Sequence, residues 1–220
     1  MAIALFVGLG VWQVQRLHWK HALIARVDAR VHAAPVPLPG DDRVRADDLE
    51  YLRVRVSGAY EGDATALVRA ATDYGTGYWA MTPLRLGDGR QVWINRGFVP
   101  AGTSAKSAGA SAPSGTVTVV GLLRRNEPGG SLLQANRPAD DRWYSRDVQA
   151  LAAARRIGPV TPAFVDAQQE RCIAPASGSV RPIPGLTQIH FPDNHLMYAL
   201  TWFTMAALSA GGLVHAWRRA

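Results

Sequence analysis

Two uncharged apolar segments lie at opposite ends of the chain, with a longer polar region between them. From His195 to Trp217 the sequence contains no Asp, Glu, Lys or Arg, and the basic pair Arg218 and Arg219 follows directly. At about 1.5 Å per residue such a segment forms a helix of roughly 35 Å, which is long enough to cross the hydrocarbon core of a bilayer. We therefore predict a transmembrane helix that ends at a cationic stop.

The N-terminal segment is also apolar and has no charged side chain before Arg16. As a helix it spans only about 22 Å, so either the complete membrane helix has further residues upstream, which we favour, or its flanking region completes the crossing. A signal peptide is the alternative, but the segment lacks a basic leading region and an A-x-A-like cleavage site. The helical pattern continues to about residue 31, and three prolines between 35 and 39 then indicate an extended linker.

Alternating apolar and polar positions between the two segments predict a β-rich domain. Strands are expected at 52–56, 65–70, 78–86, 91–95, 116–123 and 161–166, and a helix at 146–157. Pro83 predicts an edge strand or a bend, and Asn95-Arg96-Gly97 predicts a strand-end turn in which Gly97 supplies backbone freedom. The small, polar segment 101–115 predicts a loose loop that tolerates change. The predicted fold class is membrane α+β: two transmembrane helices flank a mainly antiparallel β domain with one helix, folded as a small barrel or curled sheet. We expect the first transmembrane helix and its extension at 1–31, the β-rich domain at 32–190, and the second transmembrane helix with its short cationic tail at 191–220.

Composition narrows the classes of function. The net charge is +7, but Lys20 and Lys106 are the only lysines and the arginines are scattered, so we expect no nucleic-acid partner. The single cysteine, Cys172, excludes an internal disulfide, and we interpret it as a small buried side chain or an idle thiol rather than a copper ligand. No C-x-x-C, H-E-x-x-H, Walker or G-x-S-x-G motif is present. We therefore expect no enzyme activity. The alternative is a hydrolase tethered to the membrane by the two helices, but the sequence shows no set of nucleophile, base and acid that would support it.

Four segments, in their order and spacing, resemble the Surfeit locus protein 1 (Shy) family of cytochrome c oxidase assembly factors. They are LGVWQVQRLHWK at 9–20, GYWAMTPL at 77–84, INRGFVP at 94–100 and PDNHLMYALTWF at 192–203. Each segment is weak by itself, but together they extend over nearly the whole chain. Asn136, Trp143 and Asp147 resemble a weaker family segment, whereas Phe98 and Asp193 stand where the family commonly has Trp and Asn.

The resemblance implies a function, a cofactor and a location. It implies an assembly factor that binds haem a and assists its insertion into subunit I of a haem–copper oxidase, with the haem a synthesis machinery as a further candidate partner. The alternative is a haem-free membrane scaffold that stabilises an early oxidase assembly intermediate. The implied location is the bacterial inner membrane, crossed by both helices in contact with the lipid bilayer, with the large domain in the periplasm. The family's haem-associated histidine, the metal ligand, corresponds to His195.

Helix geometry agrees with a haem site. In two antiparallel helices joined by an outer domain, the end of the first lies at the depth of the start of the second, and residues 195, 198, 199 and 202 share one helix face. Neutral imidazole is a common axial ligand of haem iron, aromatic rings could flank a porphyrin, and arginine could bind its propionates. The candidate cofactor-binding set is therefore Trp12, Gln13, Arg16, His195, Tyr198 and Trp202, with Arg96 as a second propionate candidate.

The same residues have plainer interpretations. His195 beside Asn194 is also typical of a hydrated helix cap, and Tyr and Trp are typical of an interfacial belt. His18 and His21, three positions apart, could share a metal only with a third ligand. Small residues on both apolar segments could allow close approach of the helices, could dock an oxidase subunit, or could reflect ordinary Ala and Gly usage. They are Gly8, Gly10, Ala206, Ala207, Ala210, Gly211 and Gly212.

Overall fold

The computed structural model describes residues 1–172, 178–187 and 193–219, and the chain divides into two compact units. One unit is a helix pair formed by Met1–Ala29 and Gln188–Ala220, and the other is a domain formed by Arg30–Thr187. The predicted limit between 190 and 191 lies outside the described residues. The two units are described separately below.

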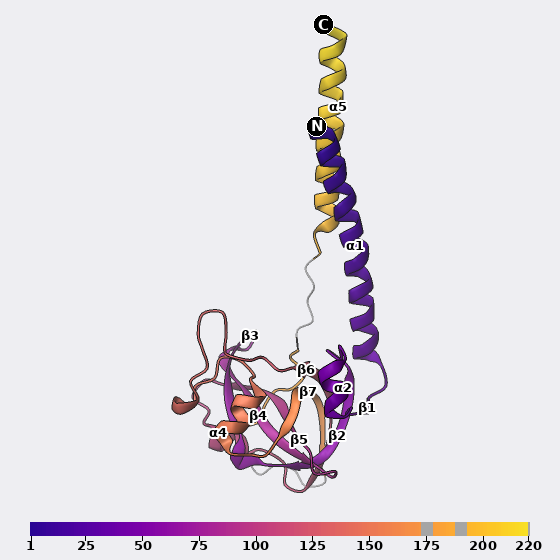
Figure 1. Ribbon diagram of the computed structural model, residues 1–220. Helices are drawn as coiled ribbons and strands as arrows, with labels where there is room; N and C mark the ends of the chain where they lie inside the picture. Colours follow the sequence, from indigo (N-terminus) through magenta and orange to yellow (C-terminus); the bar gives the residue numbers. More distant parts are fainter. Residues whose placement is uncertain (173–177, 188–192, 220) are drawn as a thin grey trace. The chain divides into compact units, whose positions relative to one another are not determined.

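The domain is a seven-stranded mixed sheet that closes on itself (Figure 1). The strand order is β1-β2-β6-β7-β5-β4-β3, and a further pairing of β2 with β4 joins five of the strands into a ring. Two pairings, β1 with β2 and β5 with β7, are parallel, and the others are antiparallel. The strands are β1 (Val36–Pro37), β2 (Arg53–Tyr60), β3 (Ala66–Thr72), β4 (Gly75–Leu86), β5 (Gln91–Pro100), β6 (Thr116–Arg125) and β7 (Val160–Cys172). The predicted barrel is thus present, with a mixed sheet.

Alternation along the strands separates two apolar clusters. Val92 and Ile94 of β5 point into the ring, where they pack with Val54, Leu84 and Val165 from neighbouring strands. The intervening residue, Trp93, points to the outer face and packs with Met81, Trp143, Leu151 and Phe164. This period of two is the signal that predicted the strands, but these strands bury both faces, because the outer face is also covered.

Three α-helices rather than the predicted single one belong to the described part of the domain. They are α2 (Asp41–Ala46), α3 (Ala105–Ala110) and α4 (Val148–Arg155), and two short 3₁₀ turns occupy Gly62–Ala64 and Pro138–Asp140. The predicted helix is α4, which buries Val148, Leu151 and Ala152 in the outer cluster. Its first turn is capped by the Asp147 carboxylate, which accepts the backbone N–H of Ala150.

The prediction of a loose loop at 101–115 was wrong. Ser104 and Ser107 form a capping box at the start of α3, and Ala108 and Gly109 are buried. A Cβ on Gly109 would lie 2.1 Å from the carbonyl oxygen of Gly62. The small side chains that suggested a flexible loop instead allow a short helix to lie close against neighbouring backbone.

Two further local expectations changed. Pro83 does not mark a sheet edge, because β4 pairs with β3 before it, with β2 after it and with β5 alongside; it marks the bend where the neighbour changes. Asn95-Arg96-Gly97, expected as a strand-end turn, lies within β5 at a register shift against β4. Gly97 has φ of +122°, and a Cβ there would lie 2.1 Å from the carbonyl oxygen of Ile183, so a β-bulge replaces the turn.

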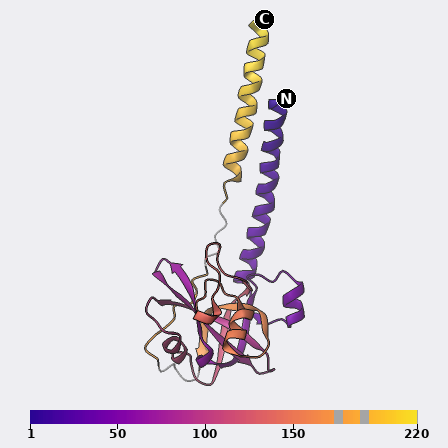
Figure 2. The same cartoon turned by 60° about the vertical axis from the view of Figure 1, so that its left-hand side comes forward.

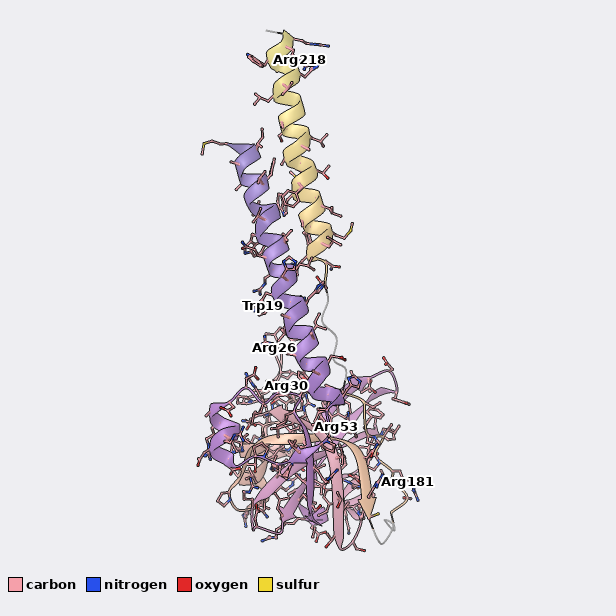
Figure 3. The ribbon with its side chains drawn as sticks, turned by 90° about the vertical axis from the view of Figure 1, so that its right-hand side faces the viewer. Trp19, Arg26, Arg30, Arg53, Arg181 and Arg218 are labelled. Carbon is pink, nitrogen blue, oxygen red and sulfur yellow. The ribbon has the colours of Figure 1, made fainter. Side chains whose placement is uncertain are left out.

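The helix pair consists of α1 (Ala2–His32) and α5 (His195–Arg219), which run antiparallel and side by side (Figures 1 and 2). Among the described residues, α5 alone is long and apolar enough to cross a membrane, with a mean hydropathy of 1.3. The first half of α1 is apolar, whereas its second half, from which Trp19 and Arg26 project (Figure 3), carries charged residues. A membrane crossing by α1 therefore stays a prediction.

Candidate functional site

The facing surfaces of α1 and α5 follow a heptad-like spacing. The less exposed positions recur every three or four residues on each helix, which is the pattern that keeps one helix face against another. They include Ile3, Phe6, Gly10, Gln13, Leu17 and Lys20 on α1, and His195, Ala199, Trp202, Ala206 and Ser209 on α5. Most of these side chains are apolar or small, and Gln13, Lys20 and His195 are the larger polar exceptions among these positions.

Gln13 and His195 form a hydrogen bond across the helix pair. The Nδ1 atom of His195 lies 2.8 Å from Oε1 of Gln13, whose side chain is largely buried. An amide oxygen can only accept, so Nδ1 carries the proton and donates it. In the neutral ring the Nε2 atom is then left with its lone pair. The arrangement therefore presents one histidine nitrogen that can ligate a metal, with the tautomer set by Gln13.

Asp193 connects the start of α5 to α1. One carboxylate oxygen accepts the backbone N–H of His195 at 3.3 Å, and the other lies 2.8 Å from Nε2 of His21. The His21 nitrogen is thus engaged by a carboxylate rather than shared with His18 in a metal site. No group of three or more potential metal ligands occurs among the described residues. Sequence reasoning had noted Asp193 only as a departure from the family pattern.

The other predicted site residues divide into two sets. Trp202 is half-buried and stacks on Phe6, with the ring centroids 5.9 Å apart. The Gln13–His195 contact lies two helical turns away from these stacked rings, on the same faces of the two helices. Trp12 and Tyr198 are more than half exposed, so their rings are available to a ligand or to lipid. Arg16 lies 4.2 Å from the ring centroid of Trp19, which was not in the predicted set.

Only part of the predicted small-residue surface contributes to the helix contact. A Cβ on Gly10 would approach the Phe203 ring to 2.6 Å, and Ala206 is buried, so these two positions permit the close approach. Gly8, Gly211 and Gly212 lie in open space, because a Cβ added at any of them would meet nothing within 4 Å. Gly10 and Ala206 therefore contribute to the helix contact at two different levels, whereas Gly8, Gly211 and Gly212 take no part in it.

Arg96 is not available to a propionate. Its side chain is 4% exposed, and its N–H groups are directed to the Glu170 carboxylate, the carbonyl oxygens of Ala108 and Ser111, and the Ser111 hydroxyl. Its guanidinium also lies 5.1 Å from the Tyr60 ring centroid. Arg96 therefore stabilises the domain by joining β5 to β7 and to the end of α3, and the propionate assignment is corrected.

A second buried polar network was missed from the sequence. The Asp166 carboxylate, which is 3% exposed, accepts hydrogen bonds from Asn95 at 2.8 Å, Arg124 at 2.9 Å and Thr187 at 2.9 Å, and lies 3.5 Å from Arg146. Burial lowers the pKa of Arg124, but Asp166 and Glu50 outweigh this and raise it. Two arginine side chains therefore pair with one buried carboxylate. These residues are far apart in the sequence, so only the strand pairing reveals the network.

Comparisons with known proteins find relatives that match over most of the chain. The model of the SURF1 family matches residues 1–207. Surfeit locus protein 1 of Mus musculus is 34% identical over 92% of this chain and 69% of its own length, and that of Homo sapiens is 32% identical over 92% and 71%. A SURF1-like protein of Monosiga brevicollis is 33% identical over 92% of this chain and 79% of its length. The matched region includes α1, the closed sheet and the Gln13–His195 pair, and the chain belongs to the SURF1 family.

Proposed function

We propose that the protein is a non-catalytic assembly factor that holds haem a on the helix pair and helps to deliver it to subunit I of a haem–copper oxidase. The observation that carries the proposal is the Gln13–His195 hydrogen bond, which favours the tautomer with the proton on Nδ1 and so leaves Nε2 as the ligating atom. When bound, haem a would supply an iron centre that an imidazole nitrogen can ligate. His195 is the residue of this chain that would provide that nitrogen.

The chemistry of the surrounding residues fits such a group. Trp12 and Tyr198 present exposed aromatic surface on the two helices, and exposed apolar side chains surround them, which suits a large flat macrocycle. Arg16 is exposed and positively charged, which suits a propionate carboxylate. Trp202, by contrast, is assigned to packing between the helices, because it is half-buried against Phe6.

Delivery requires that the group be held but not enclosed. The less exposed positions of α1 and α5 form a narrow seam, and the remaining surface of α5 is exposed along most of its length. A cofactor bound at the edge of this seam would stay open to a second membrane protein. We place the large domain on the outer, periplasmic side of a bacterial inner membrane that both helices cross, which puts His195 near the outer face.

The absorbance spectrum tests the proposal directly. The protein is co-expressed with the enzymes of haem a synthesis, purified in detergent, and measured as a reduced-minus-oxidised difference spectrum. Haem a bands at near-stoichiometric amount support the proposal. Protein that promotes oxidase assembly in cells but carries no haem would instead establish the haem-free scaffold.

Gln13 provides a sharper test of how His195 is positioned. Loss of a residue that orients a metal ligand typically lowers metal affinity by about 10–100-fold. Gln13→Leu, which keeps the size but removes the acceptor, should weaken haem a binding by this order, whereas Gln13→Glu keeps an acceptor for Nδ1–H and should retain the haem. Equal affinity in wild type and Gln13→Leu would show that the hydrogen bond does not set the ligating nitrogen.

A further inference from the structure

The loop between β6 and α4 displays two leucines at full exposure. Leu132 and Leu133 are 100% and 91% exposed, the largest exposures of any big apolar side chain within the described domain residues. Burial of a leucine is favourable, so two adjacent leucines held in water indicate a surface that something else covers.

Local hydrogen bonds hold this tip in one shape. The backbone N–H of Ser131 donates to the carbonyl oxygen of Gln134 at 2.8 Å, and the Ser131 hydroxyl accepts the N–H of Gln134 at 3.2 Å. Gly130 has φ of +124°, and a Cβ there would lie 2.4 Å from the Gln134 carbonyl oxygen, so the turn requires glycine. A hydrogen-bonded turn therefore holds the two leucines at the tip of the loop.

The base of the loop is fixed to the domain. The Asn136 amide oxygen accepts the backbone N–H groups of Tyr144 at 2.8 Å and Ser145 at 3.2 Å. The N–H of Gly129 donates to the Asp147 carboxylate at 3.1 Å. A tip that is rigid and rigidly attached loses little conformational freedom when it binds.

The charge pattern around the tip favours a lipid surface. Residues 128–136 contain no charged side chain. Arg137 and Arg142 follow, both exposed, and an antiparallel β-bridge between their backbones holds them side by side. Of the carboxylates nearest in sequence to this stretch, Asp141 is paired with Arg155 and Glu127 with Arg146, Asp147 accepts the N–H groups of Gly129 and Ala150, and Asp140 is exposed. An uncharged apolar tip with a cationic base matches the depth profile of a bilayer, where acyl chains lie beneath phosphate groups.

The chain also keeps the domain near a membrane. Only seven residues separate Thr187, the end of the domain unit, from His195, where the candidate membrane helix begins, which limits the connection to roughly 30 Å. A bilayer is thus always at high local concentration for this loop. A convex tip of two leucines enters fluid acyl chains without needing a matching groove.

We propose that the Leu132–Leu133 tip inserts into the outer leaflet of the membrane and that Arg137 and Arg142 bind lipid phosphates, forming a third membrane attachment of the protein. This attachment would restrict how the domain is presented to a partner in the same membrane. The inference is independent of haem binding.

Fluorescence quenching in vesicles tests the insertion. In the full-length chain, with Cys172→Ser to remove the native thiol, Leu132→Cys carries an environment-sensitive dye. The matched control is Gly87→Cys, in an exposed turn where an added Cβ has nothing within 4 Å. The vesicles contain phosphatidylcholine and phosphatidylglycerol, with nitroxide-labelled acyl chains as lipid quencher and iodide as aqueous quencher.

The dye at position 132 should be quenched by the nitroxide lipid and shielded from iodide, and the dye at position 87 should show the reverse. Replacing both arginines, Arg137→Gln with Arg142→Gln, should lower the lipid quenching at position 132. Iodide quenching of the 132 dye without lipid quenching would overturn the proposal. Shielding from both quenchers would also overturn it, because it would place the tip in a protein groove, such as one on a second copy of the chain.

Discussion

Replacing Arg96 by methionine should destabilise the domain without affecting haem binding directly. The methionine keeps most of the volume of the arginine stem but removes every hydrogen-bond donor and the positive charge. Glu170 would lose its ion-pair partner, and the carbonyl oxygen of Ser111 would lose the N–H group that Arg96 donates. The carbonyl oxygen of Ala108 would also lose an Arg96 N–H group but would keep the Ser111 hydroxyl as a donor. The hydroxyl of Tyr60, which donates to Glu170 at 2.6 Å, would stay beside an uncompensated carboxylate.

The magnitude follows from burial of the pair. Removing one partner of a buried ion pair costs about 3–5 kcal/mol, and the side chain of Glu170 is 19% exposed, so some water reaches it. We therefore expect about 3 kcal/mol. For a domain of 150–250 residues, 1 kcal/mol corresponds to about 2–4 °C in Tm, so the variant should melt about 6–12 °C lower. Arg96→Lys should recover only part of this, because an ammonium cannot replace a planar set of five donors.

Calorimetry of the purified protein in detergent measures Tm, and a lysine-specific protease gives a local readout. The sequence has lysines only at positions 20 and 106, and Lys106 lies in α3, whose C-terminal end Arg96 holds. The variant should therefore be cut faster at Lys106, because α3 opens more often. Cleavage at Lys20 serves as the internal control.

A double-mutant cycle decides whether the ion pair is responsible. Glu170→Gln in the Arg96→Met background should cost less than in the wild type, because the unpaired charge is removed. Strictly additive effects, or an unchanged Tm in Arg96→Met, would refute the structural role assigned to Arg96. Loss of haem a with an unchanged Tm would restore the propionate assignment.

Three further predictions rest on separate parts of the molecule. Burial, together with the Glu170 carboxylate, raises the pKa of Tyr60 well above its ordinary value of 10.0; a raised folded-state pKa means that stability is complete below pH 10.0 and is lost as the pH rises above it. Denaturant titrations should show a smaller loss above that pH in Tyr60→Phe than in wild type, and equal losses would contradict the assignment. Gly109→Ala should lower Tm despite the better helix propensity of alanine, because the added Cβ meets the Gly62 carbonyl oxygen at 2.1 Å, whereas Gly87→Ala, in open space, should not. For topology, alkaline phosphatase fused after residue 220 should be inactive and inserted in the exposed turn at Gly87–Gly89 should be active, because we place both termini in the cytoplasm; the opposite pattern would invert the orientation.

The strands were the most predictable part of the fold. Leu52 to Val56, for example, alternates apolar with charged residues, and the structure places β2 at Arg53–Tyr60. The sequence predicted a barrel or curled sheet but not which strands close it. The closing pairing of β2 with β4 depends on contacts between distant residues, such as Gly58 against the Arg85 backbone. Sequence periodicity identifies the faces of a strand but not its neighbours.

Two of the errors in the fold share one cause, which is that small residues were interpreted as flexibility. Ala108 and Gly109 looked like loop residues, yet they are buried because only small side chains fit there. Gly97 suggested a strand-end turn and instead permits a bulge beneath Ile183. A single sequence does not distinguish a glycine that needs freedom from a glycine that needs space.

The site was partly predictable because it depends on helix geometry. The antiparallel arrangement predicted that Gln13 and His195 lie at one depth, and they are joined by a hydrogen bond. The His21–Asp193 contact was missed, although both residues flank the predicted region. Helical spacing gives the depth and face of a side chain, but the choice of partner depends on rotamers that spacing does not specify.

The central claim is that His195 provides the axial nitrogen for haem a. The most direct measurement is the haem a content per protein, by absorbance, of His195→Ala purified from cells that make haem a, compared with His215→Ala and wild type. His195 is only half-buried at the start of α5 and His215 is exposed, so both variants should stay in the membrane at wild-type amounts. We expect His195→Ala to lose most of its haem a, because the axial bond is removed, and His215→Ala to retain it. Equal haem a content in wild type and His195→Ala would contradict the claim and favour the haem-free scaffold.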